Sequence, residues 1–241
     1  MQESNKNYTV ELDPYINKTN NSIIRKDINI KDGSNYYILK YDKEKMTDND
    51  IENKKYRSVI FDDNNKLQCY SLPKSIPFQT FIQENEDINN DNIIITEIIE
   101  GTMINLFYDY NKAKWQLSSK GSIGCDYFFY RNGYDKKLKK KDQLTFKQMF
   151  LTALRTDSLD IITNQLSNEY CYNFVLQHPD NHIVLNIKEP KLYLTSVWRI
   201  MDKKAVYVPQ TEFIHSEWAK SLYEIIYFPK IYDKLDNYNE M

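Results

Sequence analysis

Cysteine, histidine and glycine are all scarce in this chain. Its 241 residues include 3 cysteines, 3 histidines and 5 glycines. Cys69, Cys125 and Cys171 lie far apart, without a Cys-x-x-Cys or Cys/His spacing, so the sequence contains no zinc motif and no disulfide framework. It also lacks a glycine-rich phosphate loop and the Gly-x-Ser-x-Gly turn of serine hydrolases. We therefore expect neither histidine-based metal chemistry nor a serine triad.

The chain also lacks an excess of charge and a long apolar run. Lysine and arginine number 32 against 34 aspartates and glutamates, giving a formal net charge of -2. Binding to nucleic acid would thus need a local basic patch. No apolar run approaches the length of a membrane-spanning helix, and the first residues lack the apolar core of a signal peptide. We expect a soluble, intracellular protein without a membrane partner.

Aromatic residues, in contrast, are plentiful. The hydrophobic fraction is 41% and the aromatic fraction 14%, with 20 tyrosines, which is typical of a folded protein. We divide the chain into a polar N-terminal segment (1–35), a central domain (36–205) and a C-terminal helical extension (206–241). The heavy use of Asn, Ile, Lys and Tyr is typical of an AT-rich genome, such as that of a large DNA virus or a protist.

The spacing of apolar residues predicts an α+β fold, with a mostly antiparallel sheet and a few helices. Up to about residue 30 we expect irregular structure with a short element or two. Strands are predicted at 36–41, 56–61, 66–72, 114–123, 191–201 and 205–209, and as two runs within 170–184. Helices are predicted at 145–154, capped by Thr145, and at 157–166 and 216–226. The basic run Lys136–Lys141 is either an exposed loop or a patch that faces phosphate.

The stretch Ile93–Tyr110 has two apolar arms, rich in β-branched and aromatic residues, joined across Glu100-Gly101-Thr102. This pattern predicts a hairpin of two buried strands with a short polar turn. Gly101 can adopt a positive φ or let a ligand approach the backbone closely. The alternative is a core hairpin whose acidic turn binds nothing.

Five short motifs follow one another along the chain. They are Tyr56-Arg57-Ser58-Val59-Ile60-Phe61, then Leu72-Pro73-Lys74, then Ile98-Ile99-Glu100-Gly101-Thr102, then Trp115 with Ser119-Lys120-Gly121-Ser122, and finally Tyr172-Asn173-Phe174 with His178-Pro179-Asp180-Asn181-His182-Ile183-Val184. From about residue 56 to residue 200, their order resembles the nucleotidyltransferase domain of phage-type RNA ligases and related viral ligase-like proteins. The resemblance implies a nucleotide or RNA as ligand, and ATP with Mg²⁺ as cofactors.

The sequence also departs from that family. In the family, the third motif is Lys-x-(Asp/Glu)-Gly-(Ser/Thr), and its lysine attacks the α-phosphate of ATP to form lysyl-AMP. Here Ile98 occupies the position of that lysine, and isoleucine cannot be a nucleophile. Asn173 stands where an acidic residue is expected, and His182 where an arginine is expected. The later motifs have no convincing counterpart after Met201, with Glu224 and Lys230 as loose candidates.

Three hypotheses remain open. The first is a ligase-like fold that has lost covalent chemistry, in which Glu100, Gly101 and Thr102 form the floor of a nucleotide cleft. The positive charge that binds phosphate in this cleft would come from Arg57, Lys74 and Lys120. The second is an active nucleotidyltransferase in which Lys74 or Lys120 is a displaced nucleophile, or a second polypeptide supplies the missing motifs. The third is a non-enzymatic structural or interaction protein, in which these residues are scattered in space.

Overall fold

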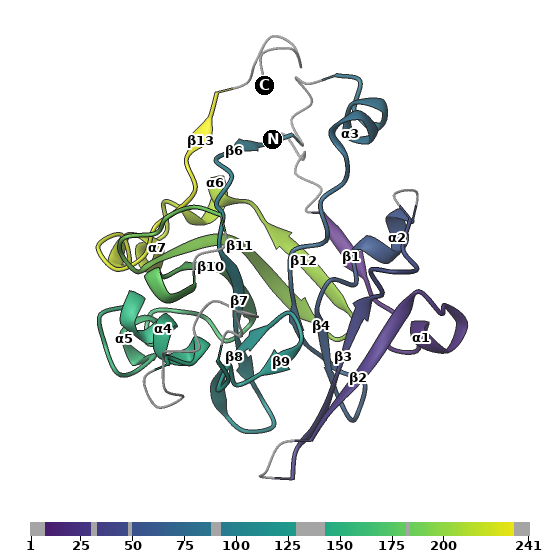
Figure 1. Ribbon diagram of the computed structural model, residues 1–241, viewed down its shortest axis with the longest axis horizontal. Coiled ribbons are helices and arrows are strands. Elements are labelled where there is room, and N and C mark those ends of the chain that lie inside the picture. The colour runs from purple at the N-terminus through teal and green to yellow at the C-terminus, as the bar shows by residue number, and fades with distance from the viewer. Residues whose placement is uncertain are drawn as a thin grey trace, which may run out of the picture.

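Two large antiparallel β-sheets pack against each other, and two short strands form a third sheet, in the computed structural model, which describes residues 8–29, 33–47, 50–87, 93–128, 143–181 and 184–233 (Figure 1). The larger sheet has the strand order β1-β12-β11-β10-β7-β8-β9. Its strands are β1 Thr9–Glu11, β7 Thr102–Asp109, β8 Lys114–Ser119, β9 Ser122–Ile123, β10 Tyr170–Gln177, β11 Lys191–Met201 and β12 Lys204–Val208. The smaller sheet, in order, is β2 Ile23–Asn29, β3 Asn35–Tyr41, β4 Val59–Asp62 and β5 Leu67–Tyr70. The predicted α+β class with mostly antiparallel pairing is confirmed.

The helices are short. They are α1 Ile16–Thr19, α2 Ile51–Lys54, α3 Phe78–Glu84, α4 Phe146–Ala153, α5 Asp160–Thr163, α6 Gln210–Phe213 and α7 Glu217–Ser221. α4 begins with a capping box, as Thr145 Oγ1 accepts the Gln148 N–H at 3.2 Å while the Gln148 side chain accepts the Thr145 N–H at 2.8 Å. The predicted cap at Thr145 is thus confirmed.

Each face of the larger sheet is covered. Figure 1 shows α4, α5 and α7 on one side of this sheet and the smaller sheet on the other. On the helical side, Phe150 of α4 packs against Phe174 of β10 at a ring-centroid distance of 5.4 Å. Between the sheets, Ile38 and Ile60 of the smaller sheet contact Phe107 of β7. Both faces of the larger sheet therefore pack against buried apolar residues.

Polar groups also join the two sheets. Asn173 Nδ2, on β10, donates to the Tyr70 carbonyl oxygen of β5 at 3.0 Å, and the Cys171 thiol donates to the same oxygen at 3.4 Å. The Sγ atoms of Cys69 and Cys171 lie 3.2 Å apart, and both residues are fully buried free thiols. Burial raises the pKa of the Cys69 thiol well above its usual value, which keeps it protonated and unreactive.

Two hairpins join strands that the sequence predicts, and both turns are held by an aspartate. Between β4 and β5, Asp62 Oδ1 accepts the N–H groups of Asn64 and Lys66. Between β7 and β8, Asp109 Oδ1 accepts the N–H groups of the residues that follow it in the turn. Aspartate side chains that bond to nearby backbone in this way favour tight turns.

The predicted hairpin over Ile93–Tyr110 is wrong. Its second arm is β7, but β7 pairs with β10 on one edge and β8 on the other, so no edge is left for the first arm. The first arm instead contains β6 Ile95–Thr96, which pairs with β13 Ile231–Tyr232. The prediction failed because apolar residues in this arm do not enter the core, and Ile98 is 95% exposed.

Two further expectations need correction. After β10 the chain forms a 3₁₀ turn at Pro179–Asn181, and within the described part of the following stretch no strand begins before Lys191. The N-terminal segment is more regular than expected, because β1 pairs with β12 and the seven-residue β2 pairs with β3. The proposed division at residues 35 and 205 stays a prediction, although these pairings connect the first segment to both sheets.

Candidate functional site

The three predicted cations lie on chain segments that contact one another. Arg57 directly precedes Ser58, whose hydroxyl donates to the Ser119 carbonyl oxygen at 3.4 Å. Ser119, in turn, directly precedes Lys120. The Ser71 N–H, three residues before Lys74, donates to the Ser58 carbonyl oxygen at 3.2 Å. Arg57, Lys74 and Lys120 are all half-buried. The start of β4, the loop after β5 and the β8–β9 turn therefore come together.

None of these three cations forms an ion pair with a carboxylate of the described residues. Lys74 Nζ donates to the Ser75 carbonyl oxygen at 3.3 Å. Lys120 Nζ donates to the Tyr41 hydroxyl at 3.0 Å and lies 4.2 Å from the centroid of that ring. For Arg57 we find no hydrogen bond or ion pair within the described ranges. Half-buried positive charge without a nearby carboxylate is suited to an anionic ligand.

Two lysines that were not predicted as site residues, Lys26 and Lys40, lie beside Gly121, the residue that follows Lys120. Lys26 Nζ, on β2, donates to the Gly121 carbonyl oxygen at 2.6 Å. Lys40 Nζ, on β3, lies 3.9 Å from the position that a Cβ atom on Gly121 would occupy. Lys26 is 95 residues away from Gly121 in the chain. No local sequence pattern signals such a contact, because it depends on how the two sheets pack.

The Glu100-Gly101-Thr102 motif connects β7 to the loop after β10. The Glu100 carboxylate accepts the Val184 N–H at 3.0 Å and the Leu185 N–H at 2.9 Å. Thr102 Oγ1 accepts a hydrogen bond from Asn181 Nδ2 at 2.7 Å. No hydrogen bond or ion pair between described residues joins Glu100 to Arg57, Lys74 or Lys120. The motif is thus engaged with the chain itself.

Gly101 has a positive φ of +155°, which was one of the two predicted alternatives, and it also allows a close approach, in which the approaching group is the neighbouring strand. A Cβ atom at this position would lie 2.6 Å from the Leu176 carbonyl oxygen and 2.7 Å from Val175 Cγ1. Contacts shorter than 3 Å are not tolerated without displacement of the neighbouring strand. The glycine therefore allows the start of β7 to pack directly on β10.

The residues at the other family positions do not face a common site. Ile98 is almost fully exposed, on the extended segment between β6 and β7. Asn173 is fully buried, and its amide bonds to the Tyr70 carbonyl oxygen, to Asn105 Oδ1 and to the Ser196 hydroxyl. His182 and the basic run Lys136–Lys141 lie outside the described residues.

The residues fit the phosphates of a nucleotide better than they fit a metal ion. No group of three or more His, Cys, Asp or Glu side chains that could hold a metal occurs in the part of the chain described. The Glu100 carboxylate already accepts hydrogen bonds from two N–H groups. Asn173 has a neutral amide in place of the carboxylate that would bind a metal ion. Glu224 and Lys230, the loose candidates near the C-terminus, are exposed.

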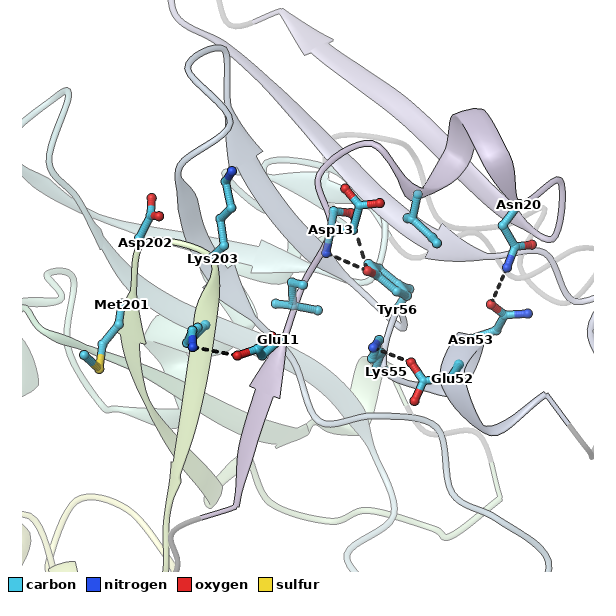
Figure 2. Close-up of a pocket in the computed structure, with 13 residues that line it drawn as sticks. Glu11, Asp13, Asn20, Glu52, Asn53, Lys55, Tyr56, Met201, Asp202 and Lys203 are labelled. Carbon is cyan, nitrogen blue, oxygen red and sulfur yellow. Dashed lines mark hydrogen bonds and ion pairs between the residues drawn. The ribbon is translucent and has the colours of Figure 1, made fainter.

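A separate pocket of about 880 Å³ is lined by none of the predicted residues (Figure 2). Its wall includes β1, α2 and the β11–β12 turn, and four of its charged residues form two ion pairs, with Lys204 Nζ 2.6 Å from Glu11 Oε1 and Lys55 bonded to Glu52. The hydrogen bond and charge of Lys204 lower the pKa of Glu11.

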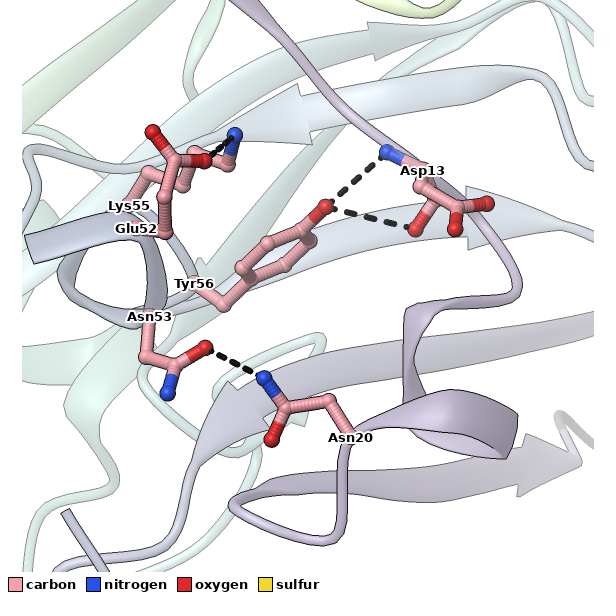
Figure 3. Close-up of polar contacts among 6 residues, drawn as sticks. All are labelled: Asp13, Asn20, Glu52, Asn53, Lys55 and Tyr56. Atoms are coloured by element: carbon pink, nitrogen blue, oxygen red, sulfur yellow. Dashed lines mark hydrogen bonds and ion pairs between the residues drawn. The ribbon is translucent and has the colours of Figure 1, made fainter. Parts of the chain in front are cut away.

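The polar groups within this pocket hold neighbouring segments together (Figure 3). Asn20 Nδ2 donates to Asn53 Oδ1 at 2.7 Å, and the Tyr56 hydroxyl accepts the Asp13 N–H at 2.9 Å. Burial raises the pKa of Tyr56 to about 12, which keeps the phenol neutral. These contacts fasten the N-terminal segment to α2, and we assign the pocket a structural role.

Comparison with known proteins gives one informative similarity. No family model matches the chain. Over 113 residues, or 47% of its length, the chain is 26% identical to an RNA ligase of Rhodothermus phage RM378, and the match spans 24% of that enzyme. Of the described helices, none is both long and apolar enough to cross a membrane. The chain is thus similar to a phage RNA ligase over about half of its own length and a quarter of the ligase.

Proposed function

We propose that this protein is an RNA ligase-like protein that binds a nucleotide or RNA and does not form a covalent nucleotidyl intermediate. Arg57, Lys74 and Lys120 would bind the phosphates. The proposal is supported by one observation, namely that the three segments that carry these half-buried cations are far apart in the sequence yet contact one another, while no described carboxylate pairs with the cations. The similarity to a phage RNA ligase supports the choice of ligand.

The loss of covalent chemistry is proposed from Ile98. Formation of lysyl-AMP requires an unprotonated amine within reach of the α-phosphate. An aliphatic side chain provides no such group, and this one is 95% exposed to solvent. The amines of Lys74 and Lys120 already donate to the Ser75 carbonyl oxygen and the Tyr41 hydroxyl, so nothing favours either as a replacement nucleophile.

The first experiment is intact-protein mass spectrometry after incubation with ATP or GTP and Mg²⁺ or Mn²⁺. We expect no adduct. An adduct that disappears in Lys74→Ala or Lys120→Ala would instead identify a displaced nucleophile and overturn the proposed loss of catalysis.

The second experiment is a binding measurement with ATP and with single-stranded RNA. We expect Arg57→Gln to weaken binding by about tenfold, because a charge-assisted contact to phosphate is lost. Arg155→Gln is the matched control, since Arg155 is exposed at the end of α4 and far in sequence from the proposed site. If the wild-type protein binds neither ligand, the proposal fails and only a structural or interaction role remains.

A further inference from the structure

A row of lysines follows the seam where β2 meets the β8–β9 turn. Lys26, Lys40 and Lys120 surround Gly121, with Lys26 bonded to its carbonyl oxygen at 2.6 Å. Figure 1 shows β9 beside the smaller sheet at this place. We call Lys26, Lys40 and Lys120, together with Lys114 at the opposite end of β8 beside the pocket described next, the lysine seam.

No carboxylate of the described residues neutralises the charges of the lysine seam. None of its four ammonium groups lies within ion-pair distance of a carboxylate in the described ranges. Asp27, the acidic residue next to Lys26, points to the opposite face of β2 and pairs with Arg25 at 2.8 Å. In a chain with a net charge of -2, this concentration of positive charge is local. Its electrostatic complement is a string of phosphates.

The seam continues into a pocket of about 370 Å³. Ile28 and Asn29, the last residues of β2, line one wall of it, so the pocket begins roughly 7 Å from Lys26 at the usual rise of a strand. Trp115 and Lys114 line the other side. The acidic residue in the lining, Asp126, lies 3.9 Å from Lys147 and is balanced by it.

The contents of this pocket suit an unpaired base and its ribose. Trp115 is half-buried and is one of the residues that line the pocket, while its ring also contacts Tyr108 at a centroid distance of 5.6 Å and Tyr172 at 6.1 Å. Exposed aromatic surface beside cations is where unpaired bases stack. The side-chain amides of Asn29 and Gln116 also line the pocket, and we find no hydrogen bond from them to any described residue. Amides can bond to a 2′-hydroxyl as donor or acceptor.

We propose that the lysine seam and the Trp115 pocket bind single-stranded RNA. Its phosphates lie along Lys26, Lys40, Lys120 and Lys114, and one base stacks on Trp115. This inference rests on the proposed function, which supplies RNA as the ligand. Lys120 belongs both to the proposed nucleotide-binding site and to the lysine seam. It adds a path for the strand, leading from the nucleotide-binding cations along β2 toward α4.

The test is fluorescence anisotropy with a labelled, short single-stranded RNA at several salt concentrations. The seam variant combines Lys26→Gln, Lys40→Gln and Lys114→Gln, and leaves Lys120 in place. We expect its affinity to fall by about 100-fold, and the slope of log affinity against log salt to become shallower by about 2, since each phosphate contact contributes about 0.7. The charge-matched control combines Lys18→Gln, Lys188→Gln and Lys220→Gln, all exposed lysines outside the seam, and should keep the wild-type affinity.

A second variant separates stacking from charge. Trp115→Leu should weaken RNA binding while leaving the salt dependence unchanged, and a thermal melt checks that it is folded. If the seam variant and its control bind RNA equally well, the seam is wrong while the proposed function stands. If wild-type protein binds no RNA at all, the proposed RNA function fails first. If single-stranded DNA of the same sequence binds as tightly, RNA as the partner is overturned.

Discussion

At the scale of single residues, Gly101 is a glycine because the neighbouring strand β10 leaves no room for a Cβ atom at this position. Gly101→Ala would place a methyl group 2.6 Å from the Leu176 carbonyl oxygen. We expect the free energy of unfolding to fall by about 2 kcal/mol, because β7 and β10 must move apart. Urea unfolding measures this. Gly121→Ala is the control, since the nearest atom to its new Cβ would be Lys40 Nζ at 3.9 Å. Equal stability of the two variants would contradict the packing argument.

His178 predicts a dependence of stability on pH. Its side chain is 4% exposed, its Nδ1 accepts the Asp180 N–H at 3.1 Å, and its Nε2 is buried without a hydrogen bond to the described residues. Burial lowers the pKa of His178 below its usual value of 6.5, and the nearby charge of Asp180 opposes this only in part. Below about pH 6.5 the unfolded chain therefore binds a proton that the folded chain does not.

We accordingly expect the stability to fall as the pH drops through the pKa of the unfolded state. His178→Asn keeps an acceptor for the Asp180 N–H but cannot titrate, so its stability should vary less between about pH 7.5 and pH 5.5. His215→Asn is the comparison, because His215 is exposed. Urea unfolding across this range checks it, and identical slopes for wild type and His178→Asn would refute it.

At the scale of elements, the start of α4 is determined locally. Thr145→Ala removes the acceptor for the Gln148 N–H and should cost about 1 kcal/mol of stability. Thr152→Ala, in the exposed part of the same helix, should change stability by less than about 0.5 kcal/mol. Chemical denaturation of both variants gives the comparison. A cost at Thr152 as large as at Thr145 would mean that the loss is not due to capping.

Most elements whose partners are close in the sequence were predicted, with β2 as the exception, whereas the pairing of β6 with its distant partner was not. The turns at Asp62 and Asp109 join strands that pair with each other, and β11 spans the predicted 191–201. β6, in contrast, pairs with β13, about 135 residues further on. Apolar character alone does not determine which strand β6 pairs with. Both edges of β7 are paired, one with β10 and the other with β8.

At the scale of the whole molecule, Asn173 connects the two sheets. Asn173→Ala would remove hydrogen-bond partners from the buried Tyr70 carbonyl oxygen, from Asn105 and from Ser196. We expect the free energy of unfolding to fall by about 3 kcal/mol, since buried polar groups would lose their partners. Asn168→Ala, at an exposed position before β10, should have little effect. If Asn173→Ala unfolds at the wild-type denaturant concentration, this amide does not hold the sheets together.

The sequence by itself determined the class of the fold, most strands and the cap of α4, because apolar periodicity, turn residues and capping act over a few neighbouring residues. It also determined that Ile98 stands where the resemblance places a nucleophile. Only the tertiary structure decided which charged residues meet. Lys26 and Lys40 join Lys120 because two sheets pack against each other, and Glu100 and Asn173 bond to the chain itself. Such contacts depend on long-range packing, which no local pattern encodes.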